Sequence, residues 1–475
     1  ILTLLIPITF AQVWYGEDAK LGKKRYIIEL KGDPLLKIFN LKEIKKFRGK
    51  ENLKKLLDQT FQANELEAKH LQFKSFLLSK NIKPKISFKY LFNGFVIEAT
   101  EREIEEIKKH PLVEKVYEEK NLTVLLNESV PLIKADEVWL LKDDQGRNVT
   151  GKNITIAIID TGVDYTHEDL GNCTESEFLD RNCSKVTGGY DFYNSDSNPM
   201  DDHGHGTHCA AIAAGNGSFK GVAPDASILA YKVCSSSGSC PTSYIIQAIE
   251  NATLEGADVI SISLGGTGDP EDATSQAVNN AVDSGVVVAV AAGNWGPGKE
   301  TISSPGTAEK AITVGASDKS DSLASFSSRG PVIWDNKIMI KPDVLAPGVS
   351  ICAAQWDNAW SDKVCAPNHV SLQGTSMATP HVAGAAALIR QMHPNWSPEE
   401  IKSALMATAK VLNYLPYEQG AGRIDVREAV NATLAMFPQS VAFGNVMGLD
   451  NVSKNITFKN IGNETYFFKI HETNV

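Results

Sequence analysis

Hydrophobic and polar positions change their spacing twice along the chain. In the first part, apolar positions recur at helical spacing over residues 51–80 and 101–111, and short apolar or alternating runs flank them. Pro111 marks the end of the second helix. The predicted strands are residues 25–30, 92–99 and 113–119. Strands and helices in this order indicate a small α+β sandwich of the βαββαβ type.

From residue 154 onward the predicted strands are almost continuously apolar. Helical patterns at residues 242–256 and 274–285 alternate with them. The strands are residues 154–160, 227–233, 258–264 and 285–294. This alternation is typical of a parallel sheet covered by helices on both faces. The main fold class is therefore α/β with a doubly wound parallel sheet, and active sites of such folds gather at the carboxyl ends of the strands.

The two ends of the chain carry patterns of their own. Residues 1–12, ILTLLIPITFAQ, form an apolar run of the length of a signal-peptide core, with a hydrophobic strand as the alternative. No other stretch has the roughly 20 apolar residues of a membrane helix. After residue 436, apolar and polar residues alternate as in the first strands of a β-domain that the chain is too short to close. We divide the chain into a signal-peptide remnant and linker (1–19), a small α+β domain (20–126), an α/β domain (127–435) and the start of a β-sandwich domain (436–475).

Acceptor motifs for N-glycosylation, Asn-x-Ser/Thr, crowd the chain after residue 120 and are absent before it. A single motif is weak evidence, but this distribution fits an exported glycoprotein that is secreted or held at the cell surface. The acceptors are Asn121, Asn127, Asn148, Asn153, Asn172, Asn182, Asn216, Asn251, Asn395, Asn431, Asn451, Asn455 and Asn463.

Cysteine spacing is consistent with export. Six of the seven cysteines form close pairs that flank polar loops. We expect disulfides between Cys173 and Cys183, Cys234 and Cys240, and Cys352 and Cys365, with Cys209 as a free thiol. Spacing does not prove connectivity, and reduced buried cysteines are the alternative.

Formal charge divides the chain into a basic and an acidic part. Residues 20–120 carry 24 Lys/Arg and 15 Asp/Glu, whereas residues 121–475 carry 23 and 40. Opposite charge favours association of the two parts, although solvated helix faces also explain the basic part. The acidic main part argues against a nucleic-acid partner, which requires a basic face.

Four polar residues with catalytic potential stand at the ends of predicted strands or the starts of predicted helices. Asp160 ends the strand IAIID, and Asn294 ends VAVAAGN. His205 in HGHGTHC and Ser376 in GTSMATPHVAGAAALIR each precede a helix of small residues. Each motif is weak evidence alone. An acid, a histidine, an amide and a serine together can form one acyl-transfer site.

The histidines of HGHGTH allow a second interpretation. His203, His205 and His208 have the H-x-H-x-x-H spacing of hydrolases with a binuclear zinc site, and neutral imidazole is both a common metal ligand and the usual general base. Those hydrolases carry an acid before the last histidine, where this chain has Thr207. A zinc site would also leave the serine and amide motifs unexplained, so we favour a histidine that moves a proton.

These four blocks resemble those of the subtilisin-like serine proteases, or subtilases, over about residues 128–435. FSSRGP (326–331), IKPDVLAPG (340–348) and GAGRIDVREAV (420–430) belong to the same pattern. The earlier segment, with FNGF and HPLVEKVYEE, is similar to the inhibitory propeptide of that family. The resemblance implies a subtilisin-like serine endopeptidase made as a zymogen, with its own propeptide as an intramolecular inhibitor.

The resemblance also assigns roles to residues. It implies a triad of Asp160, His205 and Ser376, with the amide of Asn294 and the Ser376 N–H binding the oxyanion. His203 would then be a loop residue and His208 a supporting residue. Cys209 follows His205 by four positions, and we expect its sulfur beneath or beside the imidazole. A catalytically inactive relative used for binding is a further alternative, which the filled triad positions disfavour.

An extended substrate is expected to pair as an added strand with Ser263, Leu264, Gly265 and Gly266 on one side, and with the loop 235–238, ending at Gly238, on the other. The family alignment implies a primary pocket lined by Ala291, Ala292, Gly293 and Ser303, with Trp295 near its rim. No acid is evident there, so we expect large apolar or aromatic residues before the scissile bond. The apolar junction VLLNESVP suits such a pocket, and we expect self-cleavage between Leu125 and Ser129.

No cofactor is expected for catalysis, and calcium enters only as a structural ion. Asp169 in HEDL matches a calcium ligand of many subtilases, but the loop 215–221 is shorter than the one that completes that site. Capping of a turn is the alternative role for Asp169. We expect a monomer that acts on proteins or peptides.

Overall fold

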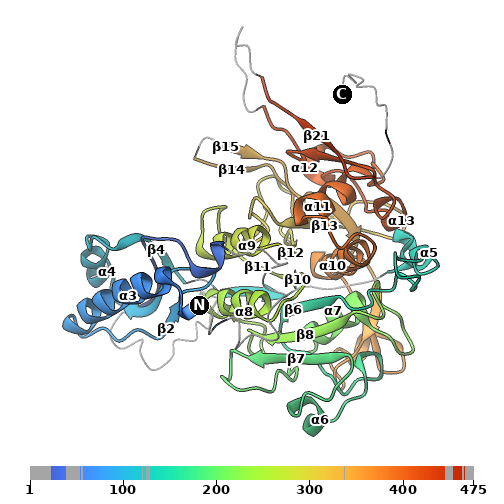
Figure 1. Ribbon diagram of the computed structural model, residues 1–475. Coiled ribbons are helices and arrows are strands. Elements are labelled where there is room, and N and C mark those ends of the chain that lie inside the picture. The colour runs from blue at the N-terminus through green and yellow to red at the C-terminus, as the bar shows by residue number, and fades with distance from the viewer. Residues whose placement is uncertain are drawn as a thin grey trace, which may run out of the picture.

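The structure, a computed structural model, describes residues 23–38, 54, 57–119, 121–124, 129–335, 337–443, 453–462 and 465. The expected signal-peptide segment and the junction residues 125–128 lie outside these ranges. Within them, no helix is long and apolar enough to cross a membrane. A small N-terminal unit, blue in Figure 1, lies beside a larger unit coloured green to red.

The small unit is an antiparallel four-stranded sheet of order β2-β3-β1-β4, with two helices on one face. Its elements are β1 (Lys24–Leu30), the 3-10 helix η2 (Leu35–Ile38), α3 (Phe61–Ser79), β2 (Ile86–Phe88), β3 (Gly94–Ala99), α4 (Glu101–Ile107) and β4 (Val113–Glu118). The sequence pattern missed β2, because three residues are too few to show alternation. α4 ends before the predicted boundary, because Pro111 has no N–H for the Ile107 carbonyl and its ring would clash with that carbonyl in a continued helix.

The other face of this small sheet packs against the larger unit. Ile27 and Val96 belong to one apolar cluster with residues of α8 (Thr242–Leu254) and α9 (Ala273–Asp283). In Figure 1, α8 and α9 lie on the side of the larger unit that faces the small sheet. The two units therefore share a buried apolar interface.

A seven-stranded parallel sheet of order β16-β13-β12-β10-β6-β8-β7 forms the centre of the larger unit. Its strands are β6 (Thr155–Asp160), β7 (Val186–Asp191), β8 (Ser227–Lys232), β10 (Val259–Ile262), β12 (Val287–Ala291), β13 (Ile312–Ser317) and β16 (Val344–Pro347). Alternate side chains of β6 point to opposite faces: Ile158 joins the cluster of α7 (His205–Ala214) and α10 (Thr375–Met392), and Ile159 joins that of α8 and α9. The predicted doubly wound parallel sheet is confirmed.

Small residues allow α7 and α10 to approach closely. A Cβ on Gly384 of α10 would lie 2.8 Å from the Ala213 carbonyl oxygen of α7 and even closer to Val222. This packing keeps the two helices side by side under the sheet. His205 begins α7 and Ser376 lies in the first turn of α10, so both side chains reach the same end of the sheet.

Shorter elements surround the central sheet. They are η3 (Pro131–Ile133), α5 (Ala135–Val138), η4 (Glu168–Leu170), α6 (Glu175–Leu179), β14 (Val332–Trp334), β15 (Lys337–Met339), β17 (Ile351–Ala354), η5 (Ser361–Lys363), β18 (Val364–Ala366), β19 (His369–Leu372), α11 (Pro398–Ala407), α12 (Pro416–Gln419) and α13 (Val426–Ala429). At the C-terminal side, β20 (Leu434–Phe437) pairs with β21 (Thr457–Asn460), and the Met436 N–H donates to Ser403 Oγ of α11. The first strand after the α/β unit is thus attached to it directly.

Candidate active site

Asp160 is the last residue of β6 and is fully buried at the carboxyl end of the sheet. Its Oδ1 atom lies 2.7 Å from His205 Nδ1 and accepts a 2.8 Å hydrogen bond from the Thr161 N–H. Because a carboxylate can only accept, His205 Nδ1 carries the proton of this contact. The contact fixes the tautomer of the imidazole and leaves Nε2 as its basic nitrogen.

His205 follows a loop that Asp201 holds in place. One carboxylate oxygen of Asp201 accepts from the N–H groups of His203 and Gly204, and the other accepts from the N–H and hydroxyl of Thr207. Gly204 has a φ of 98°, a conformation that favours glycine. Burial opposes a charge on His205, but Asp160 outweighs it and raises the pKa of the imidazole well above its ordinary value. Asp160 therefore stabilises the imidazolium that forms when His205 takes up a proton.

Ser376 lies opposite His205 across a buried thiol. Its Oγ donates to the Ser263 carbonyl at 2.9 Å, and its own carbonyl accepts from Ser263 Oγ at 2.8 Å. Cys209 Sγ is 3.8 Å from His205 Nδ1 and 3.4 Å from the Ser376 carbonyl oxygen. Ser376 Oγ is thus held by Ser263, while Cys209 contacts both His205 and the Ser376 backbone.

Asn294 stands beside Ser376 with its amide orientation fixed. Its Oδ1 accepts from the Thr375 N–H at 2.9 Å and from Thr375 Oγ1 at 3.0 Å. The backbone N–H can only donate, so the amide oxygen must face Thr375 and the Nδ2 donor must face the other way. This arrangement offers an N–H group next to Ser376, where negative charge would develop during acyl transfer.

A strand of the N-terminal part lies between two strands of the larger unit, one of which follows directly after Ser263, the hydrogen-bond partner of Ser376. β5 (Asn121–Val124) pairs antiparallel with β11 (Leu264–Gly265) on one side and with β9 (Cys240–Pro241) on the other. The first wall is the one expected from sequence. On the second side the paired residues are Cys240 and Pro241, not the expected loop 235–238. Gly238 lies in the turn just before the paired residues. Residues 121–124 are therefore held in extended conformation by strands on both sides.

The residues expected to line the primary pocket lie at the end of β12 and next to Ser303. Ala291 and Ala292 are buried, and the Ser303 N–H donates to the Ala292 carbonyl. Gly293 has a φ of 104°, and a Cβ there would collide with Ser303 Oγ. A Cβ on Gly265 would meet Ser303 Cβ at 2.8 Å. Ser303 thus packs closely against both Gly265 and Gly293. Trp295 is exposed.

The three histidines of the HGHGTH segment do not converge on one point. His208 Nε2 donates to the Ile351 and Val370 carbonyls and so anchors α7 to β17 and β19. The His203 ring lies 6.4 Å from that of His205, measured between centroids, and contacts Trp360. Among the described residues, the three histidines do not form a common metal-binding group; His205 lies instead with Asp160 and Cys209, whose ligand atoms are close enough together to hold an ion. The zinc interpretation is therefore disfavoured by geometry as well.

Asp169 is engaged by a histidine. Its Oδ2 lies 2.7 Å from His369 Nε2, and its Oδ1 accepts from the Phe219 N–H at 3.2 Å. His369 Nδ1 contacts the Pro367 carbonyl, so both ring nitrogens face acceptors and both carry protons. Burial opposes this charge, but the hydrogen bonds to Asp169 and Pro367 outweigh it and raise the pKa of His369. Glu168, Asp169 and His369 offer ligand atoms that are close enough together to hold a metal ion, but only two of these residues supply the oxygen ligands that calcium prefers.

The cysteines form three disulfides and one buried thiol. The disulfides join Cys173 to Cys183, Cys234 to Cys240 and Cys352 to Cys365, and Cys209 is free. The second of them closes the loop that forms one wall of the groove. Burial raises the pKa of Cys209, so its thiol form is favoured at neutral pH.

Glu250 of α8 holds the small N-terminal unit, and sequence reasoning did not identify it. Its carboxylate is buried and accepts from the N–H groups of Leu91 at 2.9 Å and Phe92 at 3.2 Å, while Asn280 donates to the Leu91 carbonyl. Burial, opposed by these hydrogen bonds, raises the pKa of Glu250 to about 7. An acid inside the apolar face of YIIQAIENA was the available signal. Opposite charge also meets at the surface, where Lys115 pairs with Glu271.

Comparisons with known proteins agree with this geometry. Residues 151–422 match the model of the Subtilase family, and residues 25–125 match that of Peptidase inhibitor I9. The chain is similar to the serine protease AprX of Bacillus subtilis strain 168, with 38% identity over 67% of this chain and 74% of AprX. It is 39% identical to subtilisin E of that strain, over 75% of this chain and 85% of the relative. The minor extracellular protease Vpr is 30% identical over 80% of this chain, which spans 65% of Vpr.

Proposed function

The chain belongs to the subtilase family and is a serine endopeptidase, and we propose that Asp160, His205 and Ser376 are the triad that hydrolyses the peptide bond. The observation that supports this most is the extended strand β5 in the groove beside Ser376, together with the 2.7 Å contact between Asp160 and His205. Catalysis by subtilases needs no cofactor.

In this mechanism Ser376 Oγ attacks the carbonyl carbon while His205 Nε2 takes its proton. Asp160 holds the opposite ring nitrogen and stabilises the imidazolium. His205 then gives the proton to the leaving amine, and a water molecule repeats the sequence to release the acyl group. Asn294 Nδ2 and the Ser376 N–H stabilise the oxyanion of each tetrahedral intermediate.

Substrate would lie where β5 lies, paired with Leu264 and Gly265 on one side and Cys240 on the other. Main-chain pairing of this kind accepts many sequences, so we propose broad specificity. The predicted pocket residues Ala291, Ala292, Gly293 and Ser303 carry no charge, which favours apolar side chains before the scissile bond. Ser303 packs against Gly265 and Gly293 and so limits how deep a substrate side chain can enter the pocket.

Hydrolysis of casein by the processed protein tests this proposal. We expect a sulfonyl fluoride, which reacts with activated serines, to abolish the activity, and a strong chelator to leave it unchanged. Loss of activity with the chelator alone would instead favour a metal-dependent hydrolase.

We propose further that residues 20–126 inhibit the protease until the chain cuts itself between residues 125 and 129. The I9 match supports an inhibitory propeptide, and β5 supports a substrate-like path for its C-terminal end. The carboxylate of Glu250 and the shared apolar cluster would hold the propeptide after cleavage.

The pH dependence of propeptide inhibition should reveal Glu250. In the complex its pKa is about 7, whereas an exposed Glu has its ordinary value of 4.5. The complex therefore binds a proton more tightly than the free enzyme, and the contribution of Glu250 favours the complex increasingly as pH falls through 7. We expect added propeptide to inhibit on the order of tenfold better at pH 5.5 than at pH 8 through this group.

The control is Glu250→Gln enzyme with the same propeptide. Burial lowers the pKa of His70 in the propeptide core, which weakens propeptide folding at low pH, but this effect is common to both enzymes. An identical slope of inhibition against pH in both enzymes would mean that Glu250 does not titrate in the interface.

The thiol Cys209 offers a chemical probe of the site. We expect small mercury compounds to inactivate the processed enzyme slowly, because the buried thiol ionises poorly and a bound mercury atom would displace His205. A displacement of about 1 Å costs on the order of a hundredfold in rate. Residual activity against time should show this loss in the parent but not in active Cys209→Val. Equal sensitivity in that variant would mean that another thiol is free and that the disulfide assignment fails.

We propose that the protein is exported and glycosylated. Among the nine acceptor asparagines whose exposure the structure describes, eight are exposed and Asn251 is half-buried. The relative Vpr is extracellular by name. The mass of the exported protein before and after enzymatic glycan removal tests this, and an unchanged mass would contradict it. The chain is expected to act as a monomer, and any calcium requirement would come from sites other than Asp169.

A further inference from the structure

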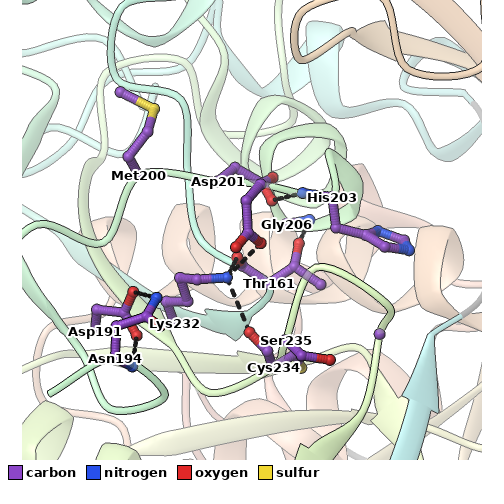
Figure 2. A network of polar contacts seen from close by, with 12 residues as sticks. Thr161, Asp191, Asn194, Met200, Asp201, His203, Gly206, Lys232, Cys234 and Ser235 are labelled. Atoms are coloured by element: carbon purple, nitrogen blue, oxygen red, sulfur yellow. Dashed lines mark hydrogen bonds and ion pairs between the residues drawn. The ribbon is translucent and has the colours of Figure 1, made fainter.

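A buried lysine lies behind the proposed triad. Lys232 is the last residue of β8 and is 1% exposed. Its ammonium donates to the carbonyl oxygens of Thr161 and Cys234, both at 2.9 Å, and to Asp202 Oδ1 at 2.5 Å. Figure 2 shows the Lys232 side chain extended toward Thr161 and Cys234. Three N–H groups thus meet three acceptors, each on a different segment of the chain.

The first acceptor is the carbonyl of Thr161, a residue that hydrogen-bonds both to Asp160 and to the first turn of α7. The Thr161 N–H donates to Asp160 Oδ1, and Thr161 Oγ1 accepts from the Gly206 N–H at 2.9 Å. Thr161 therefore orients the carboxylate and holds the first turn of α7. Lys232 anchors the carbonyl of this same residue, so a shift of Lys232 would be passed to both members of the pair.

The second acceptor lies in the loop that leads into α7. Asp202 is 40% exposed and stands between Asp201, which fixes the His203 to Thr207 backbone, and His203 itself.

The third acceptor, the carbonyl of Cys234, lies at the start of one wall of the substrate groove. Cys234 is bonded to Cys240, and Cys240 pairs with Leu122 of β5. One ammonium group thus connects the loop before His205 with the wall that binds substrate.

We propose that Lys232 is a positioning residue that fixes the triad relative to the substrate groove. The inference rests on the proposed function, because it takes Asp160 and His205 as catalytic. A buried lysine needs hydrogen-bond acceptors of any kind, but those of Lys232 lie on three segments that hold the proposed triad and the substrate strand. Lys185 provides that comparison: it is also buried, but its ammonium donates to the carbonyls of Pro224 and Ala226, away from these segments.

The test compares processed Lys232→Met and Lys185→Met enzymes. Methionine keeps most of the side-chain volume and removes the ammonium group. For Lys232→Met we expect kcat on a tetrapeptide amide to fall about tenfold or more, as misplaced catalytic groups do, and KM to rise. On a small ester that does not fill the groove, kcat should fall while KM stays unchanged. Lys185→Met should lose stability and keep both parameters.

The pH profile separates positioning from general destabilisation. His205 is faced by Asp160, Cys209 and His203, and none of them changes in Lys232→Met. Removal of a nearby cation favours the imidazolium, so the acid limb of kcat/KM should move to higher pH. Asp202→Asn removes an anion and should move it to lower pH. Lys185→Met should leave it in place.

An unchanged kcat, KM and acid limb in folded Lys232→Met would overturn the proposal. If Lys232→Met does not fold, Asp202→Asn decides, and an unchanged acid limb in that variant would overturn it as well. The activity of the parent enzyme distinguishes failure of the proposed function from failure of the proposed role of Lys232. A parent that is inactive after processing would refute the proposed function, whereas an active parent with insensitive variants refutes only the role of Lys232.

Discussion

Ser376→Ala enzyme is expected to lose about 10⁶-fold in kcat, the size of loss that removal of the nucleophile causes in a subtilisin. The reason is that Ser376 supplies the only hydroxyl in the proposed triad, and without it His205 has no nucleophile to activate. The same change should leave the precursor uncut, since the first bond to be hydrolysed is expected between residues 125 and 129. Electrophoresis of the purified precursor over time measures this.

Two controls make this result specific. Addition of a trace of active enzyme to the Ser376→Ala precursor should cut it at the same junction, which would show that the junction remains accessible. The thermal unfolding midpoint should stay near that of the parent, because the lost Oγ makes one hydrogen bond, to the Ser263 carbonyl. A Ser376→Ala precursor that still cuts itself in isolation would refute self-processing by this serine.

Asn294→Asp enzyme is expected to lose about 10²- to 10³-fold in kcat with little change in KM, as removal of the corresponding donor does in a subtilisin. Aspartate keeps an oxygen for the Thr375 N–H and hydroxyl, so the local packing is preserved. It replaces the Nδ2 donor by a carboxylate oxygen, which would repel the developing oxyanion. Steady-state kinetics on one peptide amide measures both parameters.

Asn294→Ala provides the matched comparison for this effect. It removes the donor without adding a negative charge, so its loss in kcat should be smaller than that of Asn294→Asp. If both variants lost affinity for substrate and kept kcat, Asn294 would act in ground-state binding and the proposed oxyanion role would be wrong.

The central sheet could be predicted because each strand carries its own signal. ITIAIID is apolar throughout and lies in a parallel sheet between helical layers, and β6 starts one residue after the predicted boundary. β2 could not be predicted, because its three residues depend on pairing with Val96, Phe95 and Gly94 of β3. Tertiary pairing, not local pattern, makes that strand.

The candidate site residues could be predicted from short motifs, whereas the residues that they contact could not. Asp160 and His205 each lie in a short motif, but the Asp169–His369 pair joins residues 200 positions apart that no local pattern connects. Glu250 and Lys232 do have a signal in the sequence, since each is a charged residue within an apolar segment. A buried charge of this kind predicts a specific partner, although the sequence does not say which one.

Labelling with a fluorophosphonate shows directly whether Ser376 is the nucleophile. The processed enzyme should react at a single residue, Ser376, identified by mass spectrometry of the labelled peptide. The reaction should continue in a strong chelator and stop when propeptide is added, because β5 pairs with Leu264 and Gly265, where we propose that substrate lies. Labelling at another residue, or hydrolysis of casein that persists without any labelling and disappears with the chelator, would contradict a serine protease with this triad.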